Sequence, residues 1–127
     1  MSERRYTKTH EWAVLADGVA TCGITQHAVD ELGDLTFLDY RVEAGEAVAQ
    51  GDPFGEVDSV KATSELLAPV SGTVEAINER FQREDELPAL RGSPYDEGWL
   101  VKLKVDDPAQ LEGLMDEAAY QAHCAEA

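Results

Sequence analysis

Positive charge is scarce in this sequence: 10 lysines and arginines stand against 26 aspartates and glutamates, and the formal net charge is −16. Nucleic acids and anionic membrane surfaces attract cations, so this balance disfavours both as partners. Long apolar runs are also lacking. The start, "MSERRYTKTHEW", has no apolar stretch of a secretory signal, and no segment approaches the length of a membrane span. We therefore expect a cytoplasmic protein without nucleic-acid or membrane partners.

Cysteine is almost absent, with only Cys22 and Cys124 far apart in the chain. There is no CxxC and no even spacing, so neither a zinc site nor a secreted disulfide scaffold is indicated. His10 and His27 show no metal-ligand spacing, and we expect capping or surface roles for them. A nucleotide-binding glycine loop and a nucleophile elbow are missing as well. The sequence thus predicts no metal and no independent catalytic site.

What the chain does contain is enough for a folded core. Its length of 127 residues is that of one domain, which buries a core without metal or disulfide staples. With 43% hydrophobic residues it is too apolar for a disordered acidic tail, so the charge belongs on the surface of a folded unit. We expect a single domain over residues 1–127, present as a monomer.

Local patterns near the N-terminus predict a hairpin and a helix. Residues 11–24 hold two short apolar runs separated by Asp17-Gly18, a dipeptide typical of tight hairpin turns. Thr25 is placed to cap the start of a short helix, and Gly33 stands where a glycine ends one.

Short strands account for most of the remaining chain. Residues 35–42 are rich in β-branched and aromatic side chains, and residues 99–105 alternate apolar with polar positions. Glycines and prolines recur between residues 45 and 72, which leaves room only for short strands. The predicted fold class is mainly β, a flattened β-barrel or sandwich of short strands with a short helix near the N-terminus.

The C-terminal segment, about residues 107–125, is predicted to be helical and to pack across the β core. Asp107 caps it and Pro108 takes the first helical position. Its expected apolar stripe consists of Leu111, Leu114, Met115, Ala118 and Ala119. Residues 80–98, charged and interrupted by proline and glycine, are expected to form a loop with a solvated acidic run at 84–86.

One of the four lysines stands in an unusual setting. Pro53 lies eight positions before Lys61 and Pro69 eight positions after it. Proline is tolerated at strand starts and edges but not inside a ladder, so the symmetry predicts a hairpin over residues 53–69 with Lys61 at its tip. From position alone, an ordinary solvated turn lysine remains an open interpretation.

The neighbours of Lys61 favour a chemical role. Val60 and Ala62 flank it where Asn-Gly or Asp-Gly is the usual turn chemistry. Small flanking residues leave the amine accessible to a modifying enzyme. A protruding, well-tethered hairpin is a suitable place to attach a group carrier, because the protein supplies position while the cofactor supplies chemistry.

Five segments resemble those of one known family in order and spacing. They are "YTKTHEW" (6–12), "GITQHA" (23–28), "ELGDLTFLD" (31–39), "DSVKATSELLAPVSGTV" (58–74) and "PYDEGWLVKLK" (94–104). The segment with the lysine resembles the lipoyl-lysine motif of the glycine cleavage system H proteins, and the resemblance covers about residues 6–120. Biotin carriers and the lipoyl domains of 2-oxo acid dehydrogenases share a lysine between apolar residues, but not the "THEW", "GIT" and "GWL" segments.

The resemblance implies a barrel-sandwich hybrid fold of the lipoyl and biotinyl carrier type, with lipoic acid in amide linkage to Lys61. Asp58, Ser59, Val60 and Ala62 would form the motif that a lipoate ligase or an octanoyltransferase recognises. Asp58 stands where the family usually has Glu, which keeps the charge.

The resemblance further implies a carrier that is not an enzyme. H proteins pass the aminomethyl group of glycine from a pyridoxal-phosphate glycine decarboxylase to a tetrahydrofolate-dependent aminomethyltransferase, and a dihydrolipoyl dehydrogenase reoxidises the arm. H-like proteins also serve as lipoate donors or relays for other lipoyl-dependent or stress-linked systems, and the sequence does not separate these roles. A third interpretation, an acidic interaction domain without cofactor, is disfavoured by the intact lysine motif.

By the same resemblance, a groove beside "THEW" shelters the aminomethyl amine, with Thr9, Glu11 and Glu65 as candidate contacts. In a partly desolvated groove, charge-assisted hydrogen bonds hold an ammonium better than exposed pairing does. For Glu11 and Glu65, a solvated surface carboxylate stays an open alternative in so acidic a chain.

Overall fold

The computed structural model describes residues 4–126, so positions 1–3 and 127 of the predicted domain lie outside the described residues. Its strands are β1 (Arg5–Tyr6), β2 (Glu11–Ala16), β3 (Val19–Ile24), β4 (Leu35–Tyr40), β5 (Ala47–Val48), β6 (Pro53–Ser59), β7 (Thr63–Leu67), β8 (Gly72–Ile77) and β9 (Val101–Val105). Its helical elements, with η for 3-10 turns, are α1 (Gln26–Leu32), η1 (Glu79–Gln82), η2 (Glu84–Glu86), α2 (Leu87–Gly92), α3 (Ala109–Glu112) and α4 (Glu117–Glu126).

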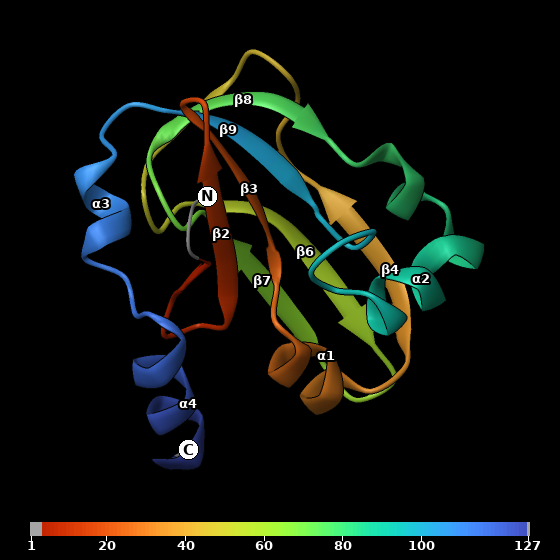
Figure 1. Ribbon diagram of the computed structural model, residues 1–127. Coiled ribbons are helices and arrows are strands. Elements are labelled where there is room, and N and C mark those ends of the chain that lie inside the picture. Colours follow the sequence, from red (N-terminus) through yellow and green to blue (C-terminus); the bar gives the residue numbers. More distant parts are fainter. Residues whose placement is uncertain (1–3, 127) are drawn as a thin grey trace.

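The strands form two antiparallel sheets packed on one core (Figure 1). The larger sheet has the strand order β1-β2-β3-β9-β8-β5, and the smaller one has the order β4-β6-β7. Val57 of β6 and Leu103 of β9, one from each sheet, are fully buried in the same hydrophobic cluster. This arrangement confirms the predicted mainly-β sandwich of short strands.

The first predicted hairpin is also confirmed. β2 and β3 pair with Ala16 opposite Val19, which leaves Asp17 and Gly18 as a two-residue turn. Both turn residues have positive φ, 52° and 79° respectively. A type I′ turn requires that conformation at both positions, and Asp-Gly is among the sequences that adopt it most readily.

Helix α1 has the two caps that the sequence predicts. The side chain of Thr25 accepts a hydrogen bond from the backbone N–H of Ala28, and Gly33, at φ 77°, donates to the carbonyl of Val29. Val29 is fully buried and fixes the helix to the core. α1 lies across the end of the sandwich at which the β6–β7 hairpin turns, and Glu31 of this helix contacts the tip of the hairpin (Figure 1).

Two predicted strands are each two residues shorter than expected. β4 ends at Tyr40 rather than at residue 42, and β9 begins at Val101 rather than at residue 99. In β9 the predicted alternation holds, because Val101 and Leu103 are buried while Lys104 is exposed.

The stretch predicted to be a charged loop, residues 80–98, is helical as far as Gly92, so that prediction is wrong for its first part. The prediction gave weight to the charged residues of this stretch and overlooked three apolar ones. Phe81, Leu87 and Leu90 are buried in the main core. Burial of these side chains holds η1, η2 and α2 over one edge of the sandwich.

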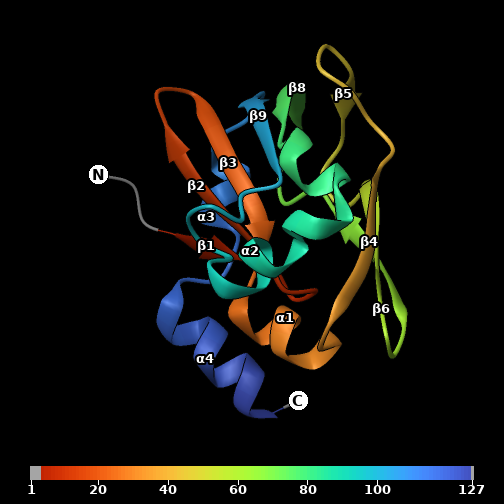
Figure 2. The same cartoon turned by 90° about the vertical axis from the view of Figure 1, so that its right-hand side faces the viewer.

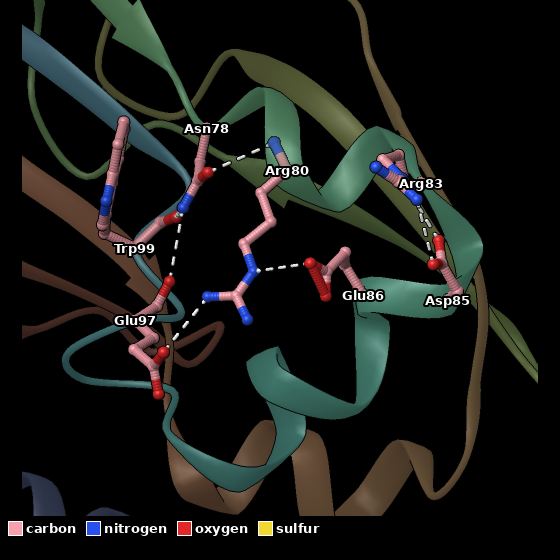
Figure 3. Close-up of polar contacts among 7 residues, drawn as sticks. All are labelled: Asn78, Arg80, Arg83, Asp85, Glu86, Glu97 and Trp99. Atoms are coloured by element: carbon pink, nitrogen blue, oxygen red, sulfur yellow. Dashed lines mark hydrogen bonds and ion pairs between the residues drawn. The ribbon is translucent and has the colours of Figure 1, made fainter.

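Charged residues of the same stretch are paired rather than simply solvated. Figure 3 shows the Arg80 guanidinium between the carboxylates of Glu86, at 3.3 Å, and Glu97, at 3.2 Å. The Asn78 side chain accepts from the Arg80 backbone N–H and donates to the Trp99 carbonyl at 2.8 Å. The Asn78 contacts join the end of β8 to the segment before β9. Because Glu86 is paired with Arg80, the acidic run at 84–86 is only partly solvated.

The predicted C-terminal helical segment contains α3 and α4. The Asp107 carboxylate accepts from the backbone N–H of Ala109, as predicted, although α3 begins one residue after Pro108. Leu111 is buried in the main core. None of the helices formed by residues 4–126 has the length and apolar character needed to span a membrane.

The apolar face of α4 differs from the predicted stripe. Ala118 and Ala119 are exposed, whereas Tyr120 is buried. Its ring stacks on that of Tyr6 with 4.4 Å between centroids, and both belong to a second cluster with Trp12. Large aromatic surfaces bury more area than alanine does, so they set the orientation of the helix beside β1 (Figure 2).

Candidate functional site

Lys61 lies at the tip of the β6–β7 hairpin, as predicted. The turn closes between Ser59 and Ala62: the Ser59 N–H donates to the Ala62 carbonyl at 2.8 Å. The Ser59 hydroxyl oxygen accepts from the backbone N–H groups of Lys61 and Ala62, at 3.2 and 3.1 Å. Just below, the Thr63 hydroxyl donates to the Asp58 carboxylate at 2.9 Å. Side-chain hydrogen bonds of this kind order a turn that lacks Asn or Gly.

The tip also contacts the junction between α1 and β4. The Val60 N–H donates to the Asp34 carbonyl at 3.1 Å, and the Lys61 ammonium reaches the Glu31 carbonyl at 3.4 Å. Asp34 is in turn paired with Arg91 of α2. Val60, beside the lysine, is 67% exposed. The lysine is thus presented to solvent on a backbone held by neighbouring elements.

A second group of predicted residues converges on Glu11, at the start of β2. Its carboxylate is buried, with the residue only 2% exposed. The hydroxyls of Thr7, at 2.6 Å, and Thr9 both donate to Oε1, and the Leu67 N–H of β7 donates to Oε2 at 3.4 Å. Burial raises the pKa of Glu11, while these donors pull the pKa down.

Glu11 forms part of the wall of a cavity of about 300 Å³. The cavity lies between the N-terminal segment, the end of β7 and the loop after α3; its lining includes Tyr6, Thr7, Thr9, Leu67, Pro69 and Met115. Most of this lining is apolar, and it contains both the Glu11 carboxylate and the Lys8 side chain.

Glu65 is placed differently from Thr9 and Glu11. It lies on β7 directly opposite Glu56 of β6, and its carboxylate is 3.6 Å from the Arg41 guanidinium, which also pairs with Glu56. Like charges directly opposite on a sheet repel, and an arginine between them offsets that repulsion. Glu65 is not among the residues that line the cavity.

Thr7 is the site residue that the sequence reasoning missed. It contacts Glu11 twice, through its hydroxyl to the carboxylate and by accepting from the Glu11 N–H at 3.0 Å. Residues 8–10 form a turn between β1 and β2 rather than a strand, so the alternation of side chains along a strand gave no signal for Thr7. The Leu67 donor belongs to the backbone and left no signal in the side-chain pattern.

The β-sandwich with a lysine on an exposed hairpin tip defines a class, the barrel-sandwich domains. The family model described as "Glycine cleavage H-protein" matches residues 4–127. The glycine cleavage system H protein of Thermotoga maritima is 44% identical, covering 99% of both chains. That of Alcanivorax borkumensis is 46% identical over 95% of this chain and 92% of its own.

A solved structure agrees with this match. The crystal structure of a glycine cleavage system H protein from Mycobacterium marinum superposes with a TM-score of 0.84 at 33% identity, covering 98% of each chain. The chain therefore belongs to the glycine cleavage H-protein family.

Proposed function

We propose that Lys61 carries lipoic acid in amide linkage and that the protein is the lipoyl carrier of a glycine cleavage system. The observation that carries this proposal is the exposed lysine at the tip of an ordered hairpin, within a chain of the H-protein family. The lipoyl group, when bound, supplies a dithiolane that can accept the aminomethyl group of glycine and be reoxidised after the group has left.

The residues around Lys61 fit such a modification. Among the described residues, its ammonium contacts a backbone carbonyl and no carboxylate, so acylation breaks no ion pair there. The amide formed keeps one N–H, which can still donate to that carbonyl. Val60, exposed beside the lysine, gives a lipoate ligase or octanoyltransferase an apolar contact, and Asp58, Ser59 and Ala62 complete the motif.

The cavity beside Glu11 is proposed to shelter the aminomethyl end of the arm. A protonated amine is stabilised by a carboxylate in an apolar pocket, and the hydroxyls of Thr7 and Thr9 hold that carboxylate in one orientation. Glu65 was predicted to join this shelter. It remains a proposed contact at the edge of β7, where release from Arg41 would free its carboxylate for the amine.

The proposed partners are those of glycine cleavage in the cytoplasm: a glycine decarboxylase, an aminomethyltransferase and a dihydrolipoyl dehydrogenase. The protein acts as a non-catalytic, monomeric carrier that visits each in turn. Its surplus of acidic side chains suits transient, electrostatically steered complexes with basic docking surfaces.

Intact-mass measurement after coexpression with a lipoate ligase tests the modification. The wild-type chain should gain the mass of one lipoyl group, and Lys61→Arg should gain none. Lys102→Arg, a lysine on β9 away from the hairpin, serves as the matched control and should be modified like the wild type. If the wild type gains no lipoyl mass, or Lys61→Arg still does, the proposed attachment is wrong.

Glycine–bicarbonate exchange separates glycine cleavage from a lipoate relay. The lipoylated protein, glycine, labelled bicarbonate and the decarboxylase of the same organism should give exchange above that of unlipoylated protein. Normal lipoylation without exchange would instead support the relay role.

A further inference from the structure

Three potential metal ligands meet outside the lysine hairpin and the Glu11 cavity. One ligand atom each of His10, His27 and Cys124 can be chosen so that all three lie within 4.8 Å of one another. The residues come from the turn before β2, from α1 and from α4. Each is half-buried, so the cluster is neither solvated freely nor sealed in the core.

Neighbouring groups hold the two imidazoles in place. The Tyr120 hydroxyl lies 2.7 Å from His10 Nδ1, and Nε2 of His27 lies 3.5 Å from the Glu31 carboxylate. Within the part of the chain that the structure describes, each imidazole therefore has one nitrogen beside a polar group, and its second nitrogen can face a metal ion. Protein metal sites commonly fix their histidines in this way, with a second partner on the nitrogen that does not face the metal.

Backbone conformation and a ring contact also hold the two imidazoles close to each other. His10 adopts φ 71°, a left-handed conformation that is uncommon for a residue with a side chain. This conformation and the ring contact with His27, at 4.5 Å between centroids, keep the imidazoles together.

We propose that His10, His27 and Cys124 bind a Zn²⁺ ion. Two imidazole nitrogens and a thiolate sulfur are donors that suit Zn²⁺, and three protein ligands leave the fourth tetrahedral position to water. Ligand atoms in such a site lie about 3.5 Å apart for bonds of about 2.0–2.3 Å, so modest side-chain rotations close it. On binding, the Cys124 thiol releases its proton to solvent.

The consequence is a clamp between segments distant in sequence. The ion would tie α4 to α1 and to the turn that precedes Glu11. Cys22 offers no competing site, because it lies fully buried among apolar residues and burial raises the pKa of its thiol.

Metal titration of the full chain without an affinity tag tests the proposal. Lys61→Arg protein is used throughout, so that no lipoyl dithiol competes for metal. We expect Zn²⁺ to bind one to one with Kd of about 10 µM or tighter and to raise Tm by several degrees at about 100 times Kd. Co²⁺ should give a thiolate charge-transfer band. Absence of saturable binding, or of the band, overturns the proposal.

Variants assign the ligands. Cys124→Ala should abolish the Co²⁺ thiolate band, whereas the matched Cys22→Ala should keep it. His27→Gln should weaken Zn²⁺ binding at least about tenfold. Far-UV circular dichroism checks that each variant is folded. A band lost in Cys22→Ala instead of Cys124→Ala, or unchanged affinity in folded His27→Gln, contradicts the assigned site. The titration of the Lys61→Arg protein with all three ligands present stands alone, so a ligand variant that fails to fold leaves the test intact.

Discussion

At the scale of single residues, Glu11 is a buried carboxyl group whose oxygens are hydrogen-bonded. A carboxylate removed from water is costly unless hydrogen bonds replace its hydration. Here two threonine hydroxyls and one backbone N–H do so, on the wall of a mainly apolar cavity. Burial of this carboxylate therefore lowers the free energy of unfolding to the extent that these hydrogen bonds do not replace its hydration.

Replacing Glu11 by Gln should alter the pH dependence of stability. Because the folded-state pKa is raised, the carboxyl contributes most below its unfolded pKa of about 4.3, and that contribution is lost as pH rises through the folded pKa. The free energy of unfolding of Glu11→Gln, relative to wild type, should thus improve from pH 4 toward neutrality. Urea denaturation across that range measures it. Glu75→Gln, at an exposed position, is the control, and an equal trend there would count against the explanation.

A glycine packed against Trp12 gives a second residue-scale prediction. A Cβ at Gly23 would lie 2.8 Å from the Trp12 indole nitrogen, whose ring is buried and donates to the Pro94 carbonyl at 3.0 Å. Gly23→Ala should therefore destabilise by about 1–3 kcal/mol. At Gly92 a Cβ meets nothing within 4 Å, so Gly92→Ala should stay within about 0.5 kcal/mol of wild type. Equal denaturation midpoints for the two variants would refute the crowding argument.

At the scale of elements, the lysine hairpin depends on one serine. Ser59 closes the turn through its backbone and accepts two backbone N–H groups through its hydroxyl. Val60 and Ala62, which are poor turn residues, therefore do not have to stabilise the turn themselves.

Ser59→Ala should slow lipoylation more than it lowers stability. Loss of the hydroxyl leaves two N–H groups at the tip to solvent, at a cost of about 1 kcal/mol, but loosens the backbone that presents Lys61. We expect kcat/KM of a lipoate ligase for the protein to fall several-fold. Ser64→Ala, exposed on β7 of the same hairpin, should leave both quantities near wild type. A drop of similar size there would point to general surface effects.

Elements also mark how far the sequence alone could predict this structure. The turn at Asp17-Gly18 and the hairpin between Pro53 and Pro69 were predictable because their signals are local. The helical turns before Gly92 were missed, although Leu87 and Leu90 gave a local signal that the surrounding charges obscured. No sequence pattern could predict that Cys124 lies near His10 and His27, since this proximity depends on how Tyr120 packs α4 against the rest of the fold.

Burial at the candidate site was expected only from the family resemblance and not from the residue pattern. The environment of Glu11 is built by Leu67 and by the loop after α3, which are distant along the chain. A carboxylate among 26 acidic residues carries no mark of burial in the sequence itself. By contrast, exposure of Lys61 followed from its place at the centre of a short hairpin.

At the scale of the whole molecule, the net charge of −16 governs how partners approach. An acidic surface attracts basic docking sites over distances comparable with the Debye length, which is about 10 Å at 0.1 M salt and about 3 Å at 1 M. Association should therefore be steered at low ionic strength and slow as salt is added.

Lipoylation kinetics provide a direct check of that steering. Between about 0.05 and 1 M monovalent salt, kcat/KM of a lipoate ligase for this protein should fall about tenfold or more, because encounter is slowed. kcat at saturating carrier should change much less, since chemistry follows binding. A salt dependence that appears only in kcat would place the effect on the enzyme rather than on the acidic carrier.

The anchoring of the hairpin tip to Asp34 and Glu31 has one further effect. Because the Val60 N–H is bound to the Asp34 carbonyl, a long chain attached to Lys61 as proposed would add freedom mainly beyond the Lys61 Cα. The turn that contains Lys61 loses its conformational entropy when the protein folds. It therefore does not lose that entropy again each time a partner binds. Under the proposed function, successive partners would search the same volume around a fixed attachment point, which would give the carried group a similar effective concentration for each of them.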